Sequence, residues 1–208
     1  MFKTIDKNMQ AEIIEKKSKF IANVFYVETV EEAEELIKKV KKEHNEARHN
    51  CYAFSVFSRD GITDRFSDDG EPSGTAGGPM LNIINSKKIT NVLVVVTRYF
   101  GGILLGTGGL VRAYTGAFQK ALEDINIIEK ELGVYAKFVV SYSDLEKLKY
   151  YLKQNDIDII NTDFNENVEV YVDITEVKLD ELNDRLNDLN FNIITQEIIQ
   201  KKYIDKKI

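Results

Sequence analysis

The residues best suited to chemistry lie in a glycine-rich segment that follows an apolar stretch of the chain. Five glycines fall within nine positions, from Gly101 to Gly109. Glycine in regular structure costs roughly 0.5–1 kcal/mol relative to alanine, so this density indicates positive φ angles or close backbone approaches. A loop that leads into a helix also presents unpaired N–H groups at the positive end of the helix dipole. We therefore expect an anion site, formed by Arg98, Tyr99, Gly101, Gly102, Gly106, Gly108, Gly109 and Arg112.

This segment does not match the known nucleotide-binding motifs. No Gly-Lys-Ser/Thr follows it, and the run from Gly106 to Val111 lacks the third glycine of a dinucleotide fingerprint. Two interpretations of the glycines stay open. One is a site for a phosphate, a nucleotide or a polyanion, and the other is a tight backbone crossing packed beneath a sheet.

A second segment, from Arg65 to Pro79, concentrates carboxylates and hydroxyls. The carboxylates of Asp68, Asp69 and Glu71 lie within four positions, and the hydroxyls of Ser73 and Thr75 follow. Such oxygens bind hard cations, although the spacing is not that of an EF-hand loop. Asp and Ser also cap turns and helix starts, while Gly and Pro set the backbone angles. The structural role is the stronger interpretation, and we expect neither a metal ion nor another cofactor.

A third group contains His44, His49 and the single cysteine, Cys51. His49 and Cys51 are two residues apart, so on a strand they share one face, and a thiolate beside an imidazole is a reasonable nucleophile. Cys51 lies in an apolar stretch, however, where a buried, inert thiol is the default. His49 is better suited to a hydrogen bond with a neighbouring loop or with a phosphate.

Arginines concentrate in the part of the chain that holds these segments. Five of the six arginines precede residue 113, and the planar guanidinium suits bidentate phosphate recognition. We therefore add His49 and Arg65 to the expected anion site.

Hydrophobic patterning places these segments on an α+β scaffold. Period-two and helical patterns predict strands at about 11–15, 20–27, 50–58, 62–67 and 92–97, and helices at about 30–44, 80–85 and 107–125. Thr29 and Glu32 form a capping box, and Arg59-Asp60-Gly61 is typical of a hairpin turn. The stretch 92–97 is apolar on both faces and must be central. We expect helices on one side of this sheet.

The chain after Gly133 contains neither glycine nor proline and is predicted to form a second domain, 133–208, after a first one, 1–132. The predicted order is strand, helix, two strands, helix and strand, which is the ferredoxin-like arrangement. Ser143 and Glu146 form a capping box for the first helix, and Leu179, Leu182, Leu186 and Leu189 mark the second. The third strand, 168–174, places Glu169, Tyr171 and Asp173 on a solvated face, which lacks the aromatic and basic pattern of an RNA-recognition sheet.

Composition narrows the class of protein. The 208 residues include 28 basic and 34 acidic side chains, a net charge of −6, and 43% are hydrophobic. Residues 134–208 hold 10 basic and 15 acidic side chains, so this part alone does not favour nonspecific polyanion binding. The sequence contains no apolar run of about 18 residues and no signal peptide pattern. We expect a cytoplasmic protein without a membrane partner.

Five blocks of sequence resemble the YigZ/IMPACT family. They are Ser18-Lys-Phe-Ile-Ala22, His49-Asn-Cys-Tyr-Ala53, Ser67-Asp-Asp-Gly-Glu-Pro-Ser-Gly-Thr-Ala76, the run from Val92 to Gly102, and Gly108-Gly-Leu-Val-Arg-Ala-Tyr114. One departure is Leu104-Leu105, where the family often has a lysine before Leu-Gly.

The resemblance implies an N-terminal domain with the ribosomal-protein second-domain-like fold shared by elongation factor G domain IV, and a ferredoxin-like C-terminal domain similar to its domain V. Eukaryotic relatives regulate translation, and no catalytic activity is firmly attached to the bacterial members. We therefore expect a translation-associated binding protein rather than an enzyme, with RNA or a ribosome-associated protein as partner. A phosphate-handling enzyme that uses the same loop and a pure protein-interaction module are the alternatives.

Overall fold

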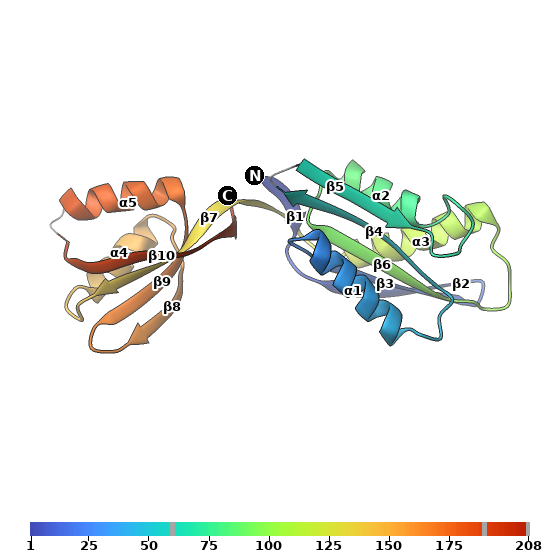
Figure 1. Cartoon of the computed structure of the whole chain (residues 1–208), viewed down its shortest axis with the longest axis horizontal. Helices are drawn as coiled ribbons and strands as arrows, with labels where there is room; N and C mark the ends of the chain where they lie inside the picture. The colour runs from blue at the N-terminus through green and yellow to red at the C-terminus, as the bar shows by residue number, and fades with distance from the viewer. Residues whose placement is uncertain (59–60, 189–190, 207–208) are drawn as a thin grey trace. The chain divides into compact units, whose positions relative to one another are not determined.

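The computed structural model describes all residues except 59–60, 189–190 and 207–208, and its described part is an α+β protein with two antiparallel sheets and five helices (Figure 1). It divides into two compact units, Phe2–Ile128 and Glu129–Ile208, the second together with Met1. The strands are β1 (Phe2–Ile5), β2 (Met9–Glu15), β3 (Ser18–Tyr26), β4 (His49–Ser58), β5 (Gly61–Ser67), β6 (Val92–Tyr99), β7 (Ile127–Val140), β8 (Ile159–Phe164), β9 (Val168–Thr175) and β10 (Ile193–Asp205). The helices are α1 (Val30–Glu43), α2 (Gly77–Ser86), α3 (Thr107–Leu122), α4 (Leu145–Gln154) and α5 (Glu176–Asp188).

The sheet of the first unit has the strand order β2-β3-β6-β4-β5, with β6 at its centre as predicted. Residues 92–98 of this strand are all buried. Because the side chains on both faces of this strand are removed from water, both faces of the sheet must be covered here.

Helices cover both faces of this sheet, so the expectation of helices on one side is wrong. Val92, Val94 and Val96 pack in a core with α2 and α3, whereas Leu93 and Val95 pack in a separate core with α1. Figure 1 shows α1 on the opposite side of the sheet from α2 and α3. The helical pattern at 30–44 predicted this helix, but such a pattern carries no information about which face of the sheet the helix covers.

The predicted start of α1 is correct, whereas α2 begins at Gly77, three residues before its predicted start. Thr29 accepts a hydrogen bond from the backbone N–H of Glu32, as the capping box predicted. Ser143, in contrast, does not cap α4: Asp144 precedes the helix, and the Ser143 hydroxyl lies 2.7 Å from that of Ser141. The predicted turn at Arg59-Asp60 and the predicted packing of Leu189 lie outside the described residues.

The second unit contains β7, α4, β8, β9, α5 and β10 in chain order, and its strands pair in the order β8-β9-β7-β10. Alternate apolar residues of β7 and β9 form a core with the leucines of α4 and α5. The chain order agrees with the predicted one.

None of the helices in the described ranges combines the length and the apolar character that a membrane crossing requires.

Candidate functional site

The glycine-rich loop between β6 and α3 begins with a close backbone contact. A Cβ atom on Gly101 would lie 2.0 Å from the carbonyl carbon of Lys17, in the turn between β2 and β3. The backbone N–H of Gly101 donates to the buried hydroxyl of Ser18 over 3.1 Å. Gly101 is therefore required for packing, which is the structural interpretation of this glycine.

Apart from Leu105, which packs against the core, the rest of this loop is open to solvent. Gly106 precedes α3 with a φ of +71°, and no side chain caps the helix, so the N–H groups of its first turn have neither an intrahelical partner nor a side-chain cap. Exposed residues of the loop and first turn are Gly102, Ile103, Leu104, Gly106, Thr107 and Gly108.

Arg112 lies beside this helix end, as the sequence predicted. Its Nη1 atom would be 3.7 Å from a Cβ on Gly108, one turn earlier in α3. A pocket of about 170 Å³ opens there, lined by Ile13, Glu15, Lys16, Leu105, Gly109, Arg112 and Ala113. The exposed Lys16, in the turn before β3, brings a second cation to the helix end, with Glu15 as the opposing charge. The arrangement can hold a small anionic group such as a phosphate.

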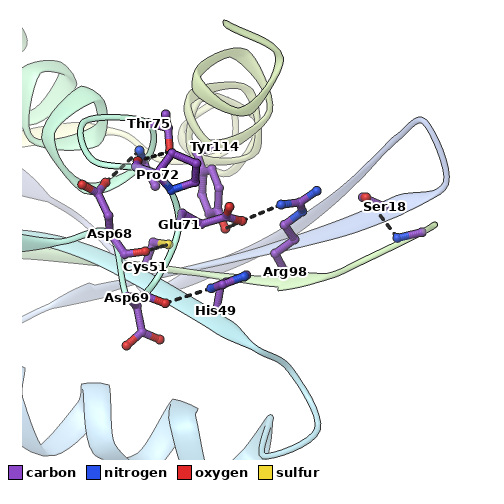
Figure 2. A network of polar contacts seen from close by, with 12 residues as sticks. Ser18, His49, Cys51, Asp68, Asp69, Glu71, Pro72, Thr75, Arg98 and Tyr114 are labelled. Atoms are coloured by element: carbon purple, nitrogen blue, oxygen red, sulfur yellow. Dashed lines mark hydrogen bonds and ion pairs between the residues drawn. The ribbon is translucent and has the colours of Figure 1, made fainter. Parts of the chain in front are cut away.

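Arg98 is not part of this open surface. The expectation that it contacts an anion there is therefore wrong. Only 6% of the residue is exposed, and its Nη1 lies 2.6 Å from Oε1 of Glu71. The hydroxyl of Tyr114 donates to the same oxygen over 2.9 Å (Figure 2). The guanidinium carbon also lies 5.5 Å from the ring centroids of Phe20 and Phe100. Arg98 therefore holds the Glu71 loop against the sheet.

The acidic loop that follows β5 is filled with internal hydrogen bonds. One oxygen of Asp68 accepts from the N–H groups of Ala76 and Gly77 at 3.0 and 2.8 Å, and the other accepts from Gly74 at 2.8 Å. Asp68 thus organises the turn and the start of α2, as the structural interpretation predicted. The Thr75 hydroxyl donates to the carbonyl of Pro72, and Ser73 is exposed.

The other two carboxylates of this loop have basic partners. Asp69 forms an ion pair with Lys41 at 2.6 Å and accepts from the N–H of Asn50 at 2.7 Å. Asp68, Asp69 and Glu71 therefore each interact with a different set of donors in the chain. In the described ranges no group of three metal-ligating side chains converges. The residues present therefore do not fit a cation held by this loop.

His49 and Cys51 are directed at the same loop. Nδ1 of His49 lies 2.9 Å from the Asp69 carbonyl oxygen, and the Cys51 thiol donates to the carbonyl of Asp68 over 3.0 Å. Burial, reinforced by the neighbouring carboxylates, raises the pKa of Cys51 to about 12. A thiol with this pKa stays protonated at neutral pH, so Cys51 is a structural donor.

The remaining predicted residues lie apart from the helix end. The exposed Arg65 pairs with Glu34 of α1, and the Tyr99 hydroxyl lies 2.9 Å from Nδ1 of His44. Sequence reasoning did not identify Tyr114, Ser18 or Lys16. Nothing in the sequence shows that Tyr114 reaches Glu71, or that the turn at Lys16 and the β6–α3 loop meet.

Comparisons with known proteins agree with this architecture. The protein-family model described as the Impact N-terminal domain matches residues 16–122, and the family model of a domain of unknown function, DUF1949, matches residues 138–189. The chain is 37% identical to the IMPACT family member YvyE of Bacillus subtilis (strain 168), over 89% of this chain and 85% of that protein. It is 38% identical to the IMPACT family member YigZ of Escherichia coli (strain K12), over 84% and 86%. A crystal structure described as a hypothetical protein is 34% identical and superposes with a TM-score of 0.63 over 96% of this chain and 97% of the other.

Proposed function

The chain belongs to the IMPACT family, and on that premise we propose that it is a translation-associated regulatory protein whose first unit binds RNA phosphate on a ribosomal partner. The observation that supports this proposal most is the uncapped, exposed start of α3 with Arg112 and Lys16 beside it. Backbone N–H groups at a helix start favour an anion, and a guanidinium adds a second, directional contact. The footprint is therefore Gly102, Gly106, Gly108, Gly109 and Arg112, without Arg98.

The proposal includes the fold assignments that the family resemblance implies. We assign the first unit to the fold of elongation factor G domain IV and the second to the ferredoxin-like fold, similar to domain V. The strand order β8-β9-β7-β10 and the chain order of strands and helices in the second unit support the second assignment.

Salt-dependent RNA binding tests the function. We expect a fluorescein-labelled U20 RNA to bind the full chain, with an affinity that falls steeply between 50 and 200 mM KCl in fluorescence anisotropy. Because one phosphate contact on a single strand contributes about 0.7 to the slope of log K against log salt, Arg112→Ala should lower the slope by about that amount.

Arg185→Ala is the matched control, because Arg185 is an exposed arginine of α5 in the other unit. Equal losses in the two variants, or an affinity that does not depend on salt, would contradict an RNA site at the start of α3.

A protein-interaction module is the second candidate, and one observation favours it. Leu104 is 83% exposed at the tip of the same loop, with Phe100 54% and Ile103 41% exposed. Exposed apolar side chains that lie close together are typical of protein-binding surfaces. If this candidate is correct, Leu104→Ser should abolish binding to purified ribosomal subunits, whereas U20 should not bind at all.

A further inference from the structure

The sheet of the second unit has one face covered by helices and one that is open within this unit. The buried apolar residues of β7 and β9 pack against α4 and α5, and the residues that alternate with them are only partly buried. Among the described residues, no helix of this unit packs on that second face. Its central part is formed by Tyr135, Lys137, Val139, Glu169, Tyr171 and Asp173.

Two tyrosines form the centre of this open face. Tyr135 of β7 and Tyr171 of β9 stack with ring centroids 5.7 Å apart and an interplanar angle of 20°. The sequence showed one aromatic residue in β9, and the second comes from a strand more than thirty positions away. Aromatic side chains on two central strands are a feature that some sheets use to stack nucleic-acid bases. The charges around the tyrosines decide which kind of partner suits this face.

At one end of the tyrosine pair, a lysine of the chain itself occupies the surface. Nζ of Lys202 lies 5.0 Å from the ring centroid of Tyr135 and 2.7 Å from a carboxylate oxygen of Asp173. This lysine combines a cation–π contact with an ion pair. Lys137 forms an ion pair with Glu197 at 3.1 Å. A cationic group is therefore the natural occupant of a position between a tyrosine ring and a carboxylate on this face.

At the other end, Lys137 is directly opposite Tyr171 in the ladder and interacts electrostatically with Glu169, but its ion pair is with Glu197 of β10. Asp163 of β8 and Glu169 of β9 are directly opposite in the ladder, and the Tyr171 hydroxyl donates to Glu169 over 2.7 Å. Like charges directly opposite each other destabilise a sheet. Within the described residues, no lysine or arginine forms a salt bridge with either carboxylate. This end therefore carries two carboxylates, Asp163 and Glu169, beside one lysine, and that lysine is paired elsewhere, so the end is locally acidic.

We propose that this open face is the docking surface for a lysine- and arginine-rich segment of a protein partner. A cationic side chain of the partner would lie between Asp163 and Glu169 and against the ring of Tyr171. Four carboxylates and two lysines surround the tyrosines, and residues 134–208 carry a net charge of −5, so this face attracts a basic segment and repels a phosphate backbone. The inference does not depend on RNA binding by the first unit.

Binding of a labelled decalysine peptide to the full chain tests this inference. We expect Asp163→Asn combined with Glu169→Gln to weaken binding at least about fivefold in fluorescence anisotropy, because two charge contacts are lost. The matched control is Asp180→Asn with Glu181→Gln, which removes two exposed charges from α5 and should leave the affinity unchanged within about twofold. Equal losses in the two double variants would overturn the inference, because they would show nonspecific attraction.

The role of the aromatic ring is tested separately. Tyr171→Leu removes the ring and should weaken decalysine binding about threefold, whereas Tyr171→Phe keeps the ring and should bind like the unchanged chain. A U10 oligonucleotide is the second probe. Binding of U10 that depends on Tyr171, or no binding of decalysine, would overturn the proposal, the first in favour of a base-stacking surface. These substitutions lie in the second unit. If they have no effect on decalysine binding, the test of the first unit with U20 and Arg112→Ala is therefore still valid.

Discussion

The two loops of the first unit that carry the chemically capable residues use them in opposite ways. In the loop 68–76, the carboxylates of Asp68, Asp69 and Glu71 all accept hydrogen bonds or ion pairs from the chain itself. In the loop 102–106, no side chain is ionisable, yet the backbone at its end is exposed and uncapped. A loop rich in charged residues is therefore not by itself a binding loop, because its donors and acceptors can satisfy one another.

The largest expected effect that tests this comparison comes from Arg98. Arg98→Ala leaves the Glu71 carboxylate buried without its counter-charge, which should lower the free energy of unfolding by about 3–5 kcal/mol. Urea denaturation followed by circular dichroism measures the change. Arg112→Ala, in the open loop region, should lower it by less than about 0.5 kcal/mol. A similar, small effect of both substitutions would show that Arg98 has no structural role.

The next effect concerns Asp68. Asp68→Ala removes the acceptor of three backbone N–H groups, so it should lower the free energy of unfolding by about 2–4 kcal/mol in the same measurement. Ser73→Ala, at an exposed position of the same loop, is the control and should have almost no effect. Equal stability of the two variants would mean that the Asp68 hydrogen bonds contribute nothing.

A smaller effect should appear in alkaline solution. The folded chain raises the pKa of Cys51 from 9.0 to about 12, mainly through burial, so the unfolded chain loses this proton first as the pH rises. Its contribution to stability is complete below pH 9 and decreases by about 1.4 kcal/mol per pH unit between about 9 and 12. Cys51→Ser keeps a donor but does not ionise there. If urea titrations at pH 8 and pH 10.5 give the same stability difference between the two proteins, the thiol does not titrate as described.

The smallest effect is expected at the tip of the open loop. Leu104→Ser should change the free energy of unfolding by less than about 0.5 kcal/mol, because the side chain is 83% exposed. Thermal unfolding measures this change. A loss above about 1 kcal/mol would place Leu104 in a packed contact and remove the contrast between the two loops.

The sequence predicted the elements of this fold better than their mutual placement. Period-two and helical patterns located nearly every strand and helix, because these patterns arise from local geometry. The pattern did not reveal β1, whose four residues, Phe2–Ile5, are too few to show a period. It also gave no direction for α1, because the face a helix covers depends on the chain path around the sheet.

For the candidate site, the sequence predicted the exposed helix start but misplaced Arg98. The burial of Arg98 can be read from the alternation along β6. Val92, Val94 and Val96 pack against α2 and α3, and Arg98 is the next residue in the same row. Its partner Glu71 could not be identified in this way, because a salt bridge between residues 27 positions apart leaves no local pattern. The same limit hid the contact between Gly101 and Lys17.

The burial of the native thiol allows site-specific labelling of the chain for spectroscopy. Cys51 is the single cysteine, and it is fully buried. A maleimide dye or spin label would therefore react selectively at Leu104→Cys in the native protein, without prior removal of the natural cysteine. Such a probe would report directly on whatever approaches the tip of the open loop.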